Sequence, residues 1–131
     1  MDYKLGRSII LWVLYILTSV ILPIPAVADV IPQFDITGIW QTGQYSYPFF
    51  QNGTEVYAVH SVQGYGHLRS GTFISPTQFK GIMTRRQKSN GCVTKAEITL
   101  TVTSSNTMTE DQIYVDSNCD IPKGARFNFT Y

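Results

Sequence analysis

The chain has 131 residues, a formal net charge of +1, 44% hydrophobic and 13% aromatic residues, and two cysteines. This length fits a single small domain, and the balanced charge excludes the concentrated basic face on which nucleic-acid binding depends. Only residues 85–88 are locally basic, which is typical of a solvated strand end. We therefore predict no nucleic-acid partner.

The first segment, residues 1–28, has the pattern of a secretory signal peptide. Two basic residues precede an apolar run over 9–22, and two prolines and an Ala-Val-Ala triplet close the segment. Cleavage after Ala28 would give a secreted or periplasmic protein. The alternative is an uncleaved membrane anchor over 9–28, although a spanning helix needs about 20 apolar residues and this run is shorter.

Residues 29–36 are a short N-terminal extension, and residues 37–131 are one β-domain. Apolar and polar residues alternate in several stretches, as in Ile98, Leu100 and Val102 with threonines between them, which predicts half-buried strands. Turn signals such as Asn52-Gly53 separate short strands that pair with their neighbours in the chain. The predicted strands are 37–43, 46–51, 54–62, 70–75, 78–87, 92–103, 107–116 and 125–131.

These strands predict an all-β fold, a single eight-stranded antiparallel up-and-down barrel. Short connections favour this meander over Greek-key crossings, and closure of the barrel removes exposed sheet edges. A two-sheet β-sandwich is the alternative.

Cys92 and Cys119 predict a disulfide, because export places them in a compartment where disulfides persist. A hairpin centred between Ser105 and Asn106 sets these cysteines opposite each other. Closing the loop between them would stabilise the fold by roughly 3 kcal/mol. No His or Cys spacing is typical of a zinc site, so no metal is predicted.

The same hairpin register predicts further cross-strand neighbours. It sets Ile98 opposite Ile113, Ala96 opposite Val115 and Leu100 opposite Asp111. The last pair would place a carboxylate inside, so this register requires either a bulge or a polar partner in the core.

The tripeptide Gly38-Ile39-Trp40 stands near the start of the first predicted strand. Followed by an eight-strand meander, it resembles the calycin barrels, which comprise lipocalins and, more distantly, avidin-like proteins. This resemblance implies that Trp40 packs across the base of the barrel. A second stretch, Ser70-Gly71-Thr72-Phe73, partly resembles the Ser-Gly loop of small exported bacterial barrels that inhibit lysozyme, and this resemblance implies a protein partner.

Aromatic residues gather in the first half of the β-domain. Core packing is the default explanation for these residues, although tyrosines at a barrel mouth suit sugars, aromatic ligands or a protein partner. His60 shares an apolar strand face with Val56 and Ala58, where it would either bond a ligand or be a satisfied core residue; His67 is expected to be exposed in a Gly-rich loop. The candidate ligand-binding residues are Tyr45, Tyr47, Tyr57, His60, Tyr65, His67 and Arg69.

No catalytic constellation is evident. The adjacent carboxylates Glu110 and Asp111 point to opposite faces of a strand and cannot converge on one substrate atom. We therefore predict a protein that binds rather than catalyses, without a cofactor.

Three hypotheses without catalysis follow. The first is a small ligand held at the barrel mouth. The second is a protein–protein module such as a hydrolase inhibitor, with a protruding loop over 63–71 making contact through Tyr65, His67 and Arg69. The third is a structural component of a cell envelope.

Overall fold

The computed structural model describes residues 28–62 and 64–131. The predicted signal segment lies outside these residues except for Ala28. The described residues form eight strands and no helix, so the predicted all-β class is confirmed. A search of the same residues for a helix that is long and apolar enough to span a membrane finds none.

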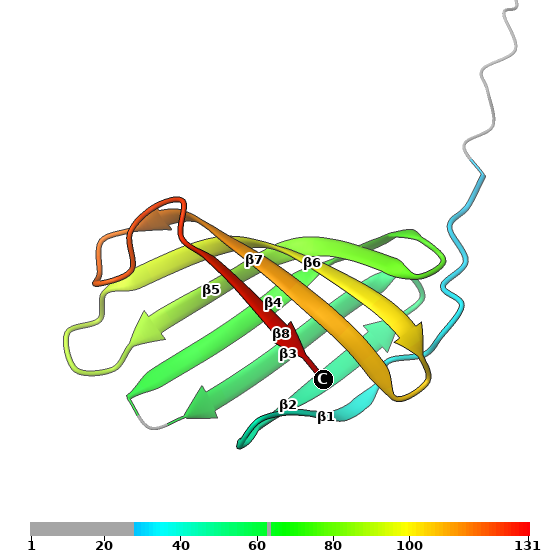
Figure 1. The fold of residues 1–131 in the computed structure, drawn as a ribbon, viewed down its shortest axis with the longest axis horizontal. Coiled ribbons are helices and arrows are strands. Elements are labelled where there is room, and N and C mark those ends of the chain that lie inside the picture. Colours follow the sequence, from blue (N-terminus) through cyan, green and yellow to red (C-terminus); the bar gives the residue numbers. More distant parts are fainter. Residues whose placement is uncertain (1–27, 63) are drawn as a thin grey trace, which may run out of the picture.

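Eight antiparallel strands follow one another in a single sheet, each paired with its neighbours in the chain (Figure 1). The bounds of β5 are those predicted, and most of the others differ from prediction by one or two residues. The strands are β1 (Gly38–Thr42), β2 (Tyr45–Asn52), β3 (Glu55–Val62), β4 (Tyr65–Ser75), β5 (Gln78–Gln87), β6 (Val93–Ser104), β7 (Thr107–Ser117) and β8 (Arg126–Thr130).

The sheet is strongly curled into a half-barrel. Within the described residues β1 and β8 are its two edges, so the meander is confirmed while closure of the barrel is not. Side chains span the interior instead: the ring of Tyr131, directly after β8, lies 5.6 Å from the ring of Tyr47 and 6.0 Å from that of Phe49, both on β2. The curl therefore brings the last strand over the second (Figure 1).

The β6–β7 hairpin differs from its predicted register. Leu100 pairs with Glu110, Ile98 with Gln112 and Ala96 with Tyr114, so the predicted pairs with Asp111, Ile113 and Val115 are wrong. The register shifts once between Val102 and Ser104 and again between Lys95 and Ala96. The first irregularity turns Asp111 outward, and the second restores the original register near the open end.

The predicted disulfide is confirmed, because the second register shift cancels the first and returns the two strands to the predicted register before they reach the cysteines. Cys92 and Cys119 are bonded, with their Cα atoms 5.8 Å apart. The bridge joins the β5–β6 connection to the β7–β8 connection at one end of the half-barrel.

Strand β4 begins at Tyr65, earlier than predicted. Residues 65–71 therefore lie in a strand, and the predicted protruding loop over 63–71 is wrong for all its described residues except Gly64. The turn is confined to the neighbourhood of Gly64, whose φ of 86° suits glycine. Two glycines and inward-facing polar residues conceal the period-two pattern of this strand in the sequence.

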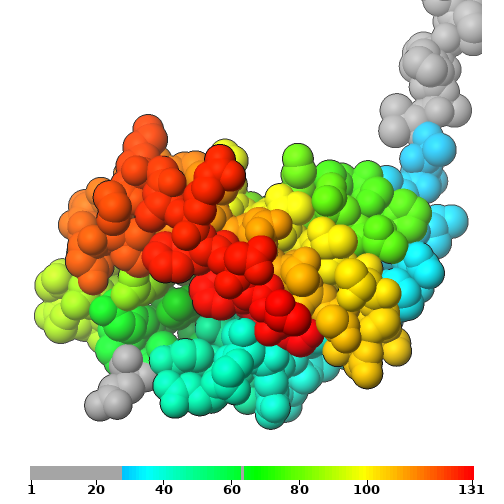
Figure 2. All heavy atoms as spheres, viewed as in Figure 1, coloured from blue at the N-terminus to red at the C-terminus, as the bar shows by residue number. Residues whose placement is uncertain are grey.

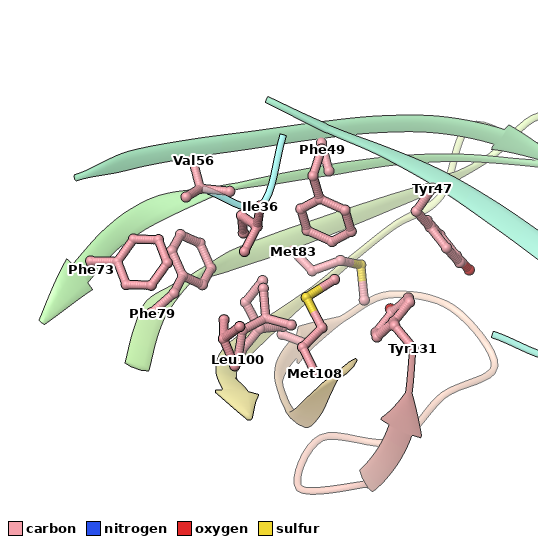
Figure 3. Packing of buried hydrophobic residues seen from close by; sticks show 14 of the residues in the cluster. Ile36, Tyr47, Phe49, Val56, Phe73, Phe79, Met83, Leu100, Met108 and Tyr131 are labelled. Atoms are coloured by element: carbon pink, nitrogen blue, oxygen red, sulfur yellow. The ribbon is translucent and has the colours of Figure 1, made fainter. Parts of the chain in front are cut away.

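The buried apolar side chains pack together on the inner face of the curled sheet (Figure 3). Ile36, from the predicted N-terminal extension, is fully buried there beside Phe49 and Val56. The extension is tied down by backbone bonds, since Gln33 N donates to the carbonyl of Pro76 at 2.7 Å. This segment thus belongs to the folded domain.

Candidate functional site

The interior side chains change from apolar to polar along the strands. The inward positions of β4 show the change, with Tyr65, His67 and Arg69 preceding Phe73. The apolar end has the β2–β3, β4–β5 and β6–β7 turns, whereas the polar end has the β3–β4 turn and the disulfide-linked connections. The polar end of the interior, which holds buried charged side chains, is therefore the candidate binding site.

A buried ion pair joins β4 to β7 across the interior. Arg69 is 2% exposed and Glu110 is fully buried, and Arg69 Nε donates to both carboxylate oxygens at 3.1 and 3.2 Å. The Tyr131 hydroxyl donates to Glu110 Oε2 at 2.8 Å, and Gln112 Nε2 donates to Oε1. Because both oxygens have partners, the cost of burying this charge is offset.

Tyr131 acts in this cluster as a protonated phenol. Burial, followed by the charge of Glu110, raises the pKa of Tyr131 well above its usual value. Its hydroxyl therefore keeps its proton and goes on donating to the carboxylate. Its oxygen also accepts a bond from Arg69 Nη2 at 3.4 Å.

Four buried side-chain polar atoms at this end have no hydrogen-bond partner within residues 28–62 and 64–131. They are Arg69 Nη1, His60 Nε2, His67 Nδ1 and Thr94 Oγ1, and Thr94 pairs with Arg85. His60 and His67 face each other across β3 and β4, and Arg69 follows His67 on the same face. Such groups are uncommon in folded proteins, and each costs about 1–3 kcal/mol if nothing satisfies it.

A cavity of about 310 Å³ opens at the polar end. Figure 2 shows the surface hollowed between the last strand (red) and strands β2 to β4 (teal to green). Four tyrosines, two arginines, four apolar side chains, a histidine and a glutamine form its lining: Tyr45, Tyr47, Val62, Tyr65, His67, Arg69, Arg85, Gln112, Tyr114, Ile121, Phe127 and Phe129.

Both arginines of the lining stack on tyrosine rings. The guanidinium carbon of Arg69 lies 4.5 Å from the ring centre of Tyr47, and that of Arg85 lies 3.8 Å from the ring centre of Tyr65. Stacking fixes the guanidinium plane and leaves the N–H groups at its edge free to bond in that plane.

The surroundings of the two histidines disfavour their charged forms. Burial, followed by the charges of Arg69, Arg85 and His60, lowers the pKa of His67 from 6.5 to about 4. Burial and then Arg69 also lower the pKa of His60. Both imidazoles are therefore neutral near pH 7, each with one nitrogen able to accept a hydrogen bond.

The structure brings together most of the residues singled out from the sequence. Five of the seven line the cavity, and His60 contacts two of them, its ring lying 4.3 Å from that of Tyr47 and 6.2 Å from that of His67. His67, expected to be exposed, is instead partly buried on β4. Tyr57 lies on the outer face, where its hydroxyl donates to Glu55 Oε2 at 2.9 Å, so it does not reach the cavity.

Sequence reasoning missed the contribution of β7 and β5. On β7 the buried, inward-facing residues are Glu110, Gln112 and Tyr114. The sequence predicts instead that the apolar residues between them, Ile113 and Val115, face the interior. The sequence predicts that Arg85 belongs to a solvated edge, whereas in the structure it lines the cavity and stands opposite His67 on β5. The signal available in the sequence was Asp111, because the predicted hairpin register placed its carboxylate in the interior and so indicated that the register was wrong.

Trp40 lies on the inner face of β1, half-buried against the core. Its Nε1 donates to the carbonyl of Ile36 at 2.8 Å, and thereby fixes the junction between the extension and β1. At the other end, the Cys92–Cys119 bridge stands two residues before Ile121, which lines the cavity. The bridge therefore restrains the mouth of the cavity.

These features define a class: an all-β half-barrel with an apolar end and a polar, arginine-bearing cavity. No group of three or more His, Cys, Asp or Glu side chains is placed to hold a metal ion in the part of the chain that the structure describes. No protein-family model, curated protein or solved structure matches the chain.

Proposed function

We propose that this protein binds a small molecule in the interior cavity and carries out no chemistry on it. The observation that carries the proposal is the coincidence of a cavity of about 310 Å³ with buried polar atoms that have no partner among the described residues. Pockets for small molecules are mostly apolar and aromatic, with a few convergent polar groups, and span roughly 300–1,000 Å³. The cavity matches this description at its lower limit, so the ligand is compact.

The inhibitor hypothesis has less support. It required a projecting loop over 63–71, but residues 65–71 lie in β4 and Arg69 points into the interior. No described feature favours a purely structural role in a cell envelope. Small-ligand binding is therefore the function that we place first.

We also propose that the domain works outside the cytoplasm after cleavage following Ala28. The Cys92–Cys119 bridge supports this proposal, because disulfides persist in oxidising compartments. Membership of the calycins is likewise a proposal, supported by the eight-strand meander and by Trp40 on the inner face of β1.

Native mass spectrometry of the protein recovered from the cell envelope or medium tests ligand binding and cleavage together. We expect a chain that begins at Asp29 and carries a small bound mass. A chain that retains residues 1–28 would contradict cleavage.

A cavity-filling variant tests the binding site directly. Val62 lines the cavity, whereas Val59 on the same strand is 60% exposed on the outer face. We expect Val62→Trp to weaken the binding of three small probes, indole, phenylacetamide and phenylacetate, by at least about tenfold, because the indole ring occupies their space. Val59→Trp is the matched control and should leave binding unchanged in ligand-observed NMR titrations.

Two results would contradict the proposed function. One is that none of the three probes binds the unmodified protein. The other is that Val62→Trp and Val59→Trp behave alike, since binding would then occur elsewhere.

A further inference from the structure

We propose that the ligand carries a carboxylate, which Arg69 and Arg85 bind at the inner wall of the cavity while the tyrosine and phenylalanine side chains hold an aromatic or other compact apolar body. This inference rests on the proposed function and specifies the chemical class of its ligand.

The two arginines are close enough to share one anion. Arg85 stands opposite His67, and Arg69 is two residues further along β4 on the same face. Diagonal neighbours on adjacent antiparallel strands lie about 7–8 Å apart at the backbone, within reach of long side chains that converge on one group.

Arg69 has donors to spare. Its Nε is used by Glu110 and its Nη2 by Tyr131, but Nη1 has no partner among the described residues. A guanidinium has five N–H donors and no acceptor, so the unpaired edge can be satisfied only by an acceptor. Glu110 balances the charge of Arg69 and leaves this edge unpaired.

Arg85 supplies the net positive charge. Its neighbouring carboxylate, Asp120, is 4.0 Å from Arg85 Nη1, and the Asp120 side chain is 67% exposed. Pairs this exposed contribute little, about 0–1 kcal/mol. The side chain of Arg85 is itself only 14% exposed, so an anion inside the cavity interacts with it in a less polar medium than Asp120 does.

The remainder of the lining fits the body of such a ligand. None of its residues is acidic, and Phe127, Phe129, Val62 and Ile121 provide apolar walls. At about 30 Å³ per water molecule, the cavity has the volume of about ten waters, too little for a long lipid chain. An arylacetate is small enough for this volume.

The test compares phenylacetate with phenylacetamide, which has the same shape without the charge. Isothermal titration calorimetry should show phenylacetate binding at least about tenfold more tightly, as expected for charge-assisted hydrogen bonds. Arg85→Gln should remove most of this preference, because it weakens the binding of the charged phenylacetate much more than that of phenylacetamide. Arg126→Gln, an exposed position on β8, is the matched control and should preserve the preference.

Arg85 is chosen over Arg69 because removal of Arg69 would leave Glu110 buried without its cation and would test folding instead. A preference that survives Arg85→Gln overturns the inference. Equal affinity for phenylacetate and phenylacetamide also overturns the inference of a carboxylate ligand. The proposed function nevertheless stands in that case if Val62→Trp still weakens the binding of both probes. Loss of all probe binding is the separate failure of the proposed function.

The pH dependence identifies which cations act. Four groups surround His67: Arg69 and Tyr65 on its own strand, Arg85 on β5 and His60 on β3. With a pKa of about 4, His67 stays neutral between pH 6 and pH 8, whereas the arginines stay charged. The affinity for phenylacetate should therefore be constant over this range, and a fall with rising pH would overturn the assignment to the arginines.

Discussion

Glu110 is the residue on which the polar end of the interior depends. Its carboxylate receives bonds from Arg69, Gln112 and Tyr131, which come from three separate segments of the chain. Each donor also orients its own strand, so the cluster fixes how β4, β7 and the residue after β8 approach one another. Buried groups of this kind stabilise a fold only when every partner is present.

Glu110→Gln should destabilise the protein strongly. The change keeps the shape of the side chain but leaves the buried guanidinium of Arg69 without a counter-charge, a loss of about 3–5 kcal/mol. Asp111→Asn, one residue away, is the control, because Asp111 is exposed and bonds only Asn128 among the described residues. It should cost no more than about 0.5 kcal/mol. Urea unfolding of both variants measures the difference, and equal midpoints would show that the ion pair contributes nothing.

At the scale of single elements, Gly71 and Gly81 explain how β4 and β5 pass so closely. They face each other across the two strands. A Cβ on Gly71 would overlap the backbone of Lys80 and Gly81, and a Cβ on Gly81 would overlap the backbone of Ser70. The ring of Phe79 covers both positions, so an aromatic side chain fills the space that the glycines leave.

Gly71→Ala should therefore cost about 1–3 kcal/mol through overpacking against the neighbouring backbone. Gly66→Ala on the same strand is the comparison, because an added Cβ there meets nothing within 4 Å. We expect it to be neutral or slightly stabilising, since alanine reduces the freedom of the unfolded chain. Thermal unfolding followed by circular dichroism separates the two, and a tolerated Gly71→Ala would refute this explanation of the close approach.

The elements show what could be predicted from the sequence. Period-two alternation and turn dipeptides placed most strands within one or two residues, because those signals depend on neighbouring residues alone. The β6–β7 register failed because a bulge depends on which face the rest of the sheet can accept. Asp111 and Ile113 alternate as regularly as Glu110 and Gln112, and only a partner on β4 decides which pair lies inside.

The candidate site was predictable to the extent that it lies on local patterns. The tyrosines of β2 and the histidine of β3 could be assigned from strand alternation. Arg85 and Gln112 could not, because they reach the cavity only after the sheet curls. The curl is a property of the whole sheet, set by strand twist and by contacts between residues as distant in sequence as Tyr47 and Tyr131.

At the scale of the molecule, an open half-barrel has to cover an interior that a closed barrel would seal by itself. The Cys92–Cys119 bridge and its loops restrain the polar end. The N-terminal extension performs the corresponding role at the apolar end, where Ile36 N donates to Gln51 Oε1 at 3.0 Å and the side chain is fully buried. The extension thus stabilises the apolar core and leaves the cavity accessible.

Ile36→Ala tests this role of the extension. Loss of a fully buried isoleucine side chain costs about 2–5 kcal/mol, which lowers the melting temperature by roughly 10 °C or more in a domain of this size. Ile31→Ala is the matched control, since Ile31 belongs to the same extension and is 77% exposed. It should leave the melting temperature within about 2 °C, as expected for a surface substitution. If both variants melt alike, the extension is dispensable; if only Ile36→Ala is destabilised, the buried side chain of Ile36 closes the apolar end of the fold.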